Sequence, residues 1–191
     1  MRVRRHRIAA EAFSFTGLHN LNGEGQEMRK SRWFAGVLAA SAFLAWGLAA
    51  NAFADAKADI TELEHKCAAA TTADDLMKCY DASNDLVVYD LMTPREFDGG
   101  DAVRTDFQNG FSAFKNPKVE FINLHVLSDG KMGVAESVQH MTATDNSGKP
   151  IDMIFRVTDV WRKEKGGWKI IHSHISLPVD MASGKADMQS K

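Results

Sequence analysis

The spacing of apolar residues changes once along the chain, from the steps of three and four typical of helices to the alternation typical of strands. The helical spacing predicts three helices, whose apolar positions are Ile60, Leu63, Cys67 and Ala70, then Leu76, Met77 and Tyr80, then Val103, Phe107, Phe111 and Phe114. Asp101 is the expected N-cap of the third helix, which Pro117 ends. The β-branched run 86–91, between the second and third helices, predicts a strand.

From Lys118 onward the apolar residues alternate with polar ones. The alternation predicts strands at 118–127, 132–144, 151–163 and 168–177, joined by glycine-containing turns. Helices followed by an antiparallel meander define the α+β class. Residues 181–191 are polar and are predicted to form a flexible tail.

The strand at 151–163 carries apolar side chains on both faces. One face has Ile151, Met153, Phe155, Val157 and Trp161, and the other has Ile154 and Val160. A sheet face in contact with water is normally more polar. We therefore expect helices on one face and a second copy of the chain on the other, with Ile151, Met153 and Phe155 in the contact of a homodimer.

Residues 1–54 are interpreted as a leader. Three basic residues at 29–32 precede an apolar run from Trp33 to Ala50, and Ala52-Phe53-Ala54 follows. These are the three parts of a secretory signal peptide, here 28–54, with cleavage after Ala54. We expect a periplasmic or secreted protein without a membrane anchor; the alternative, an uncleaved anchor, has an apolar run close to the lower length limit for spanning a bilayer. Residues 1–27 are either an extended basic leader or untranslated, with the start at Met28.

The two cysteines, Cys67 and Cys79, both follow the leader. An even number of cysteines in an exported chain favours a disulfide over the alternative of two free thiols. On one continuous helix twelve residues would separate them by about 18 Å, whereas a disulfide needs Cα atoms within about 7 Å. A bridge therefore requires a chain reversal, which we place at Thr71-Thr72, with Thr72 capping the second helix.

Charge narrows the range of partners. Residues 55–191 carry 22 acidic and 16 basic side chains. An acidic body does not suit nucleic acid, whose phosphates need a basic surface. The whole chain is 45% hydrophobic, as is typical of a globular protein.

The end of the chain resembles a known family. The segment 166–176, with its Gly-Gly-Trp-Lys-Ile-Ile-His-Ser-His sequence, together with 156–163 and 86–90, is similar to SnoaL-like and ketosteroid-isomerase-like proteins of the nuclear transport factor 2-like superfamily. The resemblance covers about 58–180 and implies a SnoaL-like domain at 55–180. It implies a cone-shaped fold in which three N-terminal helices pack on a curved, mainly antiparallel sheet, with an apolar pocket at the open end, and a homodimer. A similar hairpin occurs in the association domain of calmodulin-dependent kinase, which is not catalytic.

Asp90 is the first candidate for chemistry. It lies near the end of the first strand, on the face of Leu86 and Val88. In ketosteroid isomerases a carboxylate at the matching place is the proton-shuttling base, and desolvation in an apolar pocket raises its pKa to suit that task. The structural alternative is a strand-end Asp that bonds the next loop. The first helix lacks the Tyr that serves these isomerases as oxyanion donor, which counts against steroid isomerisation.

The last strand supplies further candidates. His172 and His174 alternate with Ser173, which places them on the sheet face of Trp168, Ile170 and Ser176. We predict that His172 acts with Asp90 in catalysis and that the ligand contacts Arg156, His174, Trp168 and Ser176, all in one cavity. The alternatives are core histidines satisfied by their neighbours and an ion pair between Arg156 and Asp90, which would lower the pKa of Asp90. Two histidines without a converging third ligand do not predict a metal, and no cofactor is predicted.

The register of the last hairpin decides which of these residues are neighbours. A two- or four-residue turn pairs Trp161 with Ile170, whereas a three- or five-residue turn pairs Arg156 with His174. The glycines favour the second register, with a three-residue turn.

The sequence thus predicts an exported protein that binds a small, largely hydrophobic molecule. The enzymatic hypothesis is proton transfer of the isomerase, cyclase or dehydratase type with Asp90 as base. The alternative is a non-catalytic dimeric module that binds a ligand or a protein.

Overall fold

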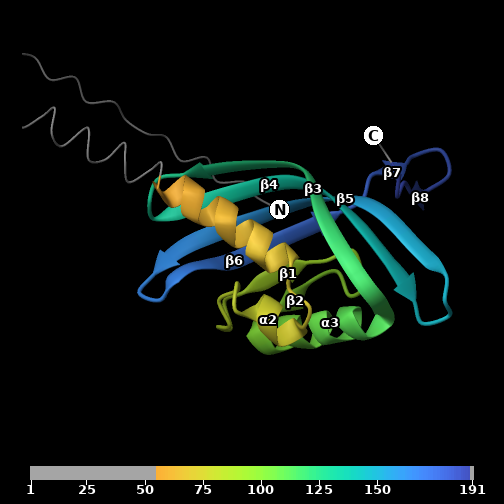
Figure 1. Cartoon of the computed structure of the whole chain (residues 1–191), viewed down its shortest axis with the longest axis horizontal. Coiled ribbons are helices and arrows are strands. Elements are labelled where there is room, and N and C mark those ends of the chain that lie inside the picture. Colours follow the sequence, from red (N-terminus) through yellow and green to blue (C-terminus); the bar gives the residue numbers. More distant parts are fainter. Residues whose placement is uncertain (1–54, 190–191) are drawn as a thin grey trace, which may run out of the picture. The chain divides into compact units, whose positions relative to one another are not determined.

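The computed structural model describes residues 55–189, so the predicted leader lies outside the described residues (Figure 1). Residues 55–68 are helical. The remaining elements are α2 (Ala73–Met77), β1 (Val87–Tyr89), β2 (Phe97–Asp98), α3 (Gly100–Ala113), β3 (Phe114–Ser128), β4 (Met132–Asp145), β5 (Pro150–Glu164), β6 (Gly167–Ser176), β7 (Val179–Asp180) and β8 (Lys185–Ala186). Within 55–189 no helix has the length and apolar character needed to cross a bilayer.

The protein has the predicted α+β fold, with a six-stranded sheet in the order β2-β1-β6-β5-β4-β3. Strands β3 to β6 form an antiparallel meander, and β1 runs parallel to β6. The helix 55–68 lies across one face of this sheet, and α2 and α3 lie next to β1 and β2 (Figure 1). We call the helix-covered face the inner face and the opposite one the outer face.

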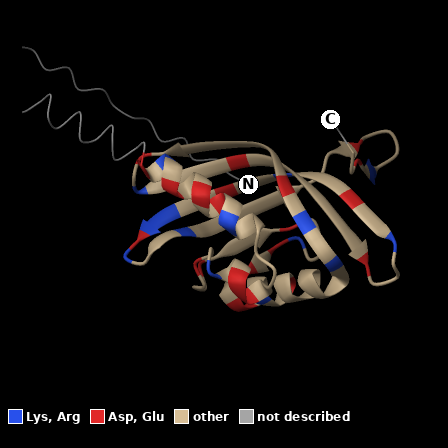
Figure 2. Ribbon diagram, in the orientation of Figure 1, with Lys and Arg blue, Asp and Glu red and all other residues tan. Residues whose placement is uncertain are grey.

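The main core lies between the helix 55–68 and the inner face of β4 to β6. Ile60 and Trp161 are completely buried there. A Cβ atom at Gly133 would lie 2.4 Å from Cδ1 of Ile60, so the helix can sit this close only because position 133 has no side chain. Figure 2 shows acidic and basic residues along the helix 55–68. All of them are exposed except Glu64, which is buried.

A second apolar cluster lies on the inner face beyond the main core. It is built on Met153, Phe155 and Val157, against which Leu91, Val119, Met141, Ile175 and Leu177 pack. The assignment of Met153 and Phe155 to a dimer contact was therefore wrong, because strand alternation turns the odd-numbered side chains of β5 toward the interior. On β4 and β5 the aliphatic residues of the outer face are Val134, Val138, Ile154 and Val160, all half-buried.

The β5–β6 hairpin has a two-residue turn, so Glu164 pairs with Gly167 and Trp161 pairs with Ile170. The predicted three-residue turn was wrong. A β-bulge at Ile171 then shifts the register, so that His172 pairs with Val160 and His174 pairs with Thr158. Because the extra residue switches the alternation, Trp168 and Ile170 face inward whereas His172, His174 and Ser176 face outward. The prediction that these five residues share one face was therefore wrong, because it did not include the bulge.

The chain after β6 differs from the predicted flexible tail. Strands β7 and β8 pair with each other, and the segment that follows returns to β5. The amide of Ile154 donates to the carbonyl oxygen of Met188 at 2.8 Å, and the Gln189 side chain donates to the Asp152 carbonyl oxygen at 2.7 Å. These bonds attach the chain to a part of β5 that β6 does not reach.

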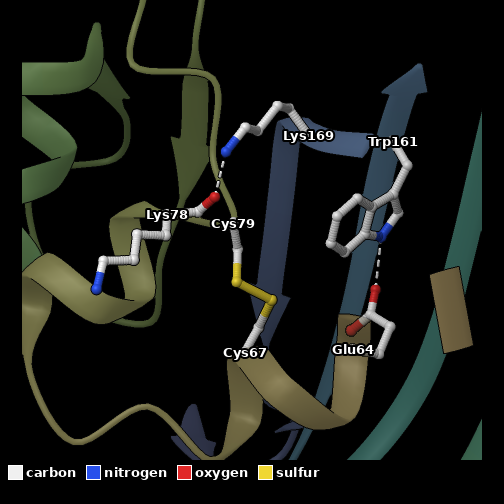
Figure 3. The surroundings of a disulfide bond; sticks show 6 residues. All are labelled: Glu64, Cys67, Lys78, Cys79, Trp161 and Lys169. Carbon is white, nitrogen blue, oxygen red and sulfur yellow. Dashed lines mark hydrogen bonds between the residues drawn. A yellow bond between two sulfur atoms is a disulfide. The ribbon is translucent and has the colours of Figure 1, made fainter. Parts of the chain in front are cut away.

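The disulfide Cys67–Cys79 is present and joins the helix 55–68 to the second residue after α2 (Figure 3). Its Cα atoms are 6.2 Å apart because the chain reverses before α2, where the Thr72 hydroxyl accepts the amide of Asp75. The segment is also held from the other side, since the amide of Ile170 in β6 donates to the carbonyl oxygen of Cys79 at 2.8 Å.

Replacing both cysteines, Cys67→Ala with Cys79→Ala, should lower the free energy of unfolding by about 2–3 kcal/mol, because the open chain gains conformational entropy when it unfolds. Urea denaturation of the two proteins measures the difference. Thiol titration of the unfolded, unreduced native sequence is the control and should find no free thiol. Two free thiols in exported material would contradict the bridge.

Candidate functional site

Two carboxyl groups meet where β1 ends. Asp90 follows β1 and is half-buried, and its carboxylate accepts the amide of Leu91 at 2.6 Å. Asp106, on the inward side of α3, is only 9% exposed. Burial, the negative charge of Asp90 and a hydrogen bond to Asp90 together raise the pKa of Asp106 to about 7. Near neutral pH one proton is therefore available at this pair of carboxyl groups.

Asp90 also lines a cleft of about 360 Å³, together with Tyr89, Arg95, Glu96 and His174. The guanidinium of Arg95 donates to Glu96 at 2.9 Å, so its charge is engaged at the rim. The Tyr89 ring meets His174 edge-on, with centroids 5.7 Å apart. Asp90 is thus the group that connects the cleft to the buried Asp106.

The structure brings Asp90 and His174 to this cleft and separates the other predicted site residues from it. His172 contacts the Tyr89 ring, and its Nδ1 donates to the Val87 carbonyl oxygen at 2.8 Å. Trp168 is buried on the inner face, and Ser176 pairs with Arg156. The prediction that Asp90, Arg156, His172 and His174 point into one cavity does not hold, because only Asp90 and His174 line the cleft, whereas Arg156 lines a separate groove and His172 is bonded to Val87.

Arg156 lines a different depression, on the outer face of the sheet. This groove of about 500 Å³ also includes Asn123, His125, Glu136 and Thr158. Arg156 therefore lies on the face opposite Asp90, and the alternative ion pair between them is not formed.

A second group of polar side chains lies deep in the core. The indole Nε1 of Trp161 donates to Glu64 at 2.6 Å (Figure 3). Burial, followed by the charge of Asp159, raises the pKa of Glu64 to about 8, and burial raises the pKa of Asp159 to about 7. The Tyr80 phenol is buried near both acids, which raise its pKa further. Ser173, completely buried, stands beside Tyr80 and Asp159.

The sequence carried a signal for part of this group. Asp159 alternates with Val157 and Trp161, which places it on the inner face, and Glu64 is four residues after Ile60 on the apolar side of its helix. Asp106 likewise is three residues after Val103. Each acid occupies an apolar stripe, which is the local conflict expected at a functional site.

Comparison with known proteins places the chain in a family. The sequence model of the SnoaL-like domain matches residues 60–180, so the chain belongs to the SnoaL-like domain family. No match was found among curated proteins.

Solved structures agree on the nuclear transport factor 2-like fold. A protein of this fold from Pseudomonas putida KT2440 is 23% identical, with a TM-score of 0.64 over 72% of this chain and 97% of its own. A superfamily member from Salmonella enterica serovar Typhimurium LT2 is 22% identical, with a TM-score of 0.62 over 70% and 99% of the two chains. A ketosteroid isomerase-like protein from Erwinia carotovora atroseptica SCRI1043 is 17% identical, with a TM-score of 0.54 over 63% and 94%.

The buried acids predict that the protein loses stability as pH rises. Their pKa values are raised in the folded state, so between about pH 5 and pH 8 the folded chain holds protons that the unfolded chain has released. Stability is then highest at the acidic end of this window and falls toward the folded-state pKa. Glu64→Gln should make the fall shallower, by up to about 1.4 kcal/mol per pH unit for one proton.

Urea denaturation at about pH 5, pH 7 and pH 9 measures this slope. The matched control is Glu62→Gln, an exposed residue of the same helix, which should keep the native slope. Parallel slopes for native protein and Glu64→Gln would contradict the proton held at Glu64.

Proposed function

We propose that the protein binds a small, largely hydrophobic molecule in the cleft beside Asp90 and transfers a proton on it, with Asp90 as the base. The observation that supports this most directly is the position of Asp90, which lines the cleft and at the same time contacts the buried carboxyl group of Asp106. The fold shared with a ketosteroid isomerase-like protein agrees with chemistry of this kind.

The two carboxyl groups have complementary parts in such a reaction. The Asp90 carboxylate takes a proton from the substrate, while Asp106 holds a proton and so avoids two adjacent negative charges. Returning the proton from Asp90 to a second atom is an isomerisation. Delivering the proton of Asp106 to a leaving hydroxyl group is a dehydration. His174, on the same cleft, orients a polar group of the substrate. His172, held by the Val87 carbonyl, positions the Tyr89 ring.

Removing the base should remove the reaction even on a probe that is not the natural substrate. A nitrobenzisoxazole is suitable, because loss of its carbon-bound proton breaks the ring N–O bond and yields a coloured phenolate. Asp90→Asn should lower kcat/KM for this probe by about 100-fold, the size of a general-base contribution. Asp98→Asn, an exposed neighbour on β2, is the control and should react like the native protein. Equal rates for Asp90→Asn and native protein would refute the assignment of Asp90 as base.

We also propose that the chain is exported to the periplasm or beyond. The disulfide supports this, because disulfides persist in oxidising compartments and are rare in the cytosol. The signal-like sequence before Asp55 also supports export.

The second candidate function is a dimeric binding module, and the outer face of the sheet is the observation in its favour. Val134, Val138, Ile154 and Val160 form an aliphatic group on β4 and β5, on the face that no helix of the described chain covers. A second copy of the chain would bury this group and the groove around Arg156. The dimer is compatible with catalysis at Asp90, because the groove around Arg156 and the cleft at Asp90 share no lining residue.

Val138→Lys should convert such a dimer to a monomer, because it places an unpaired charge in the centre of the contact. Light scattering at micromolar concentration should show the mass halved. Gln108→Lys, an exposed position on α3, is the control and should leave the mass unchanged. A native protein that is already monomeric would contradict the dimer.

A further inference from the structure

Arg156 stands on an interior strand of the outer face with no acid beside it. It is exposed, and the register places it between Val138 of β4 and Ser176 of β6. Along β5 the next side chains on this face are Ile154 and Thr158. All four neighbours are uncharged, and within 55–189 the Arg156 guanidinium forms no ion pair. An opposite charge on a neighbouring strand would stabilise this cation, but the described chain does not supply one.

The groove of about 500 Å³ around Arg156 brings two further donors to it. Asn123 of β3 lies in the same cross-strand row, on the other side of Val138. The Asn123 side-chain oxygen accepts the amide of Val138 at 2.9 Å, which turns this side chain toward Val138 and leaves its nitrogen to donate to a ligand. Thr158, exposed on β5, adds a hydroxyl. Neighbouring strands are about 4.8 Å apart, so one small group above Val138 lies between these donors.

Glu136 is the acid on the wall of the groove. The register pairs it with His125 on β3 and with Thr158 on β5, one position along from the row of Arg156. Its carboxylate lies 3.8 Å from Nδ1 of His125, so it turns toward β3 and away from Arg156 on β5. Glu136 therefore forms an acidic boundary of the groove and does not neutralise Arg156.

We propose that this groove binds a small organic acid, whose carboxylate accepts hydrogen bonds from Arg156, Asn123 and Thr158. Its apolar body lies on Val138 and Ile154, which are both half-buried. A guanidinium donates two parallel hydrogen bonds to a carboxylate, which makes Arg the preferred residue for this group. The volume of the groove is in the range of small-molecule sites. The inference does not rest on the proton transfer proposed for the cleft, because cleft and groove share no lining residue.

A carboxylate fits the charge of this groove better than a second copy of the chain does. In a two-fold dimer both copies contribute the same patch. A contact centred on the groove would therefore bring the two Arg156 side chains toward each other, with Glu136 turned away from both. A carboxylate neutralises Arg156 instead. The acid and the second copy are thus alternative occupants of the groove.

Benzoate, benzyl alcohol and benzylamine are probes of nearly equal size that differ in charge. At about pH 8 benzoate is ionised and benzylamine is protonated. Titrations of the purified protein followed by NMR should give benzoate an affinity about tenfold higher than benzyl alcohol, the value of one hydrogen bond to a charged group. Benzylamine should bind least. The amide signals of Val138 and Thr158 should shift as benzoate is added, whereas those of Tyr89 and Leu91, at the cleft, should not.

Two variants that each remove one charge from the groove should have opposite effects. Arg156→Gln should lower the affinity for benzoate about tenfold and leave that for benzyl alcohol unchanged. Glu136→Gln should raise the affinity for benzoate about twofold, because a nearby negative charge is lost. Arg156→Lys keeps the charge without the paired donors, so its affinity should lie between those of Arg156→Gln and the native protein.

Lys165→Gln is the matched control. Lys165 is exposed in the turn between β5 and β6, so the variant loses one positive charge away from the groove and should bind benzoate like the native protein. A thermal melt of each variant confirms that it is folded.

Equal affinity of the native protein for benzoate and benzyl alcohol would overturn the proposal, as would a preference for benzoate that survives Arg156→Gln. Shifts confined to residues outside the groove would overturn it too. Light scattering tests the other occupant, and a dimer that excludes benzoate from the groove would refute the acid. Asp90→Asn should keep the native affinity for benzoate, so failure at the groove and failure of the proton transfer at the cleft are separate results.

Discussion

The hydrogen bond from Trp161 to Glu64 holds the helix 55–68 on the centre of the sheet. The position of this helix in turn affects where the elements around the site lie. The helix lies close because Gly133 has no side chain to displace Ile60. Cys67, three residues beyond Glu64 on the same helix, bonds to Cys79 and so holds the end of α2 close to this helix. The next residue, Tyr80, pairs with Ile170 of β6. The Trp161–Glu64 hydrogen bond is thus linked, through the helix and the disulfide, to β6, the strand that carries His174 of the cleft.

The β-bulge at Ile171 decides which chemistry reaches which face. Without the extra residue, His172 and His174 would share the inner face with Trp168, and Ser173 would point outward. With it, Ser173 joins the buried acids, and the two histidines meet Tyr89 on the outside. Because β1 runs parallel to β6, Tyr89 and Asp90 emerge beside His174, and the end of β1 becomes the point where outer cleft and inner carboxyl groups touch.

Local sequence patterns predicted the elements well and the contacts between them less well. The first and third helices, the meander and the Thr72 cap follow from spacing within short segments, and the disulfide follows from the even number of cysteines after a signal-like leader. The expected cap at Asp101 was wrong, because Gly99 is the N-cap of α3. The inward direction of Asp90 follows from alternation with Val88. The hairpin register could not be derived, because a two-residue turn and a three-residue turn use the same glycines. The pairing of Asp90 with Asp106 depends on how α3 packs against its neighbours. The apolar stripe around Phe107 predicts which face of α3 is buried, but it does not determine the position of the helix along its axis to better than one turn.

The buried acids connect the energetics of this fold to its function. Each one reduces stability at neutral and alkaline pH compared with an apolar residue, because the folded state must either keep a proton or bury a charge. A sequence retains such positions where they serve a site, since stability alone would favour apolar side chains there. A ligand that donates to the acids acts on both quantities at once. It binds the folded state only, so its binding free energy adds to stability, and it does so most where the acids are ionised.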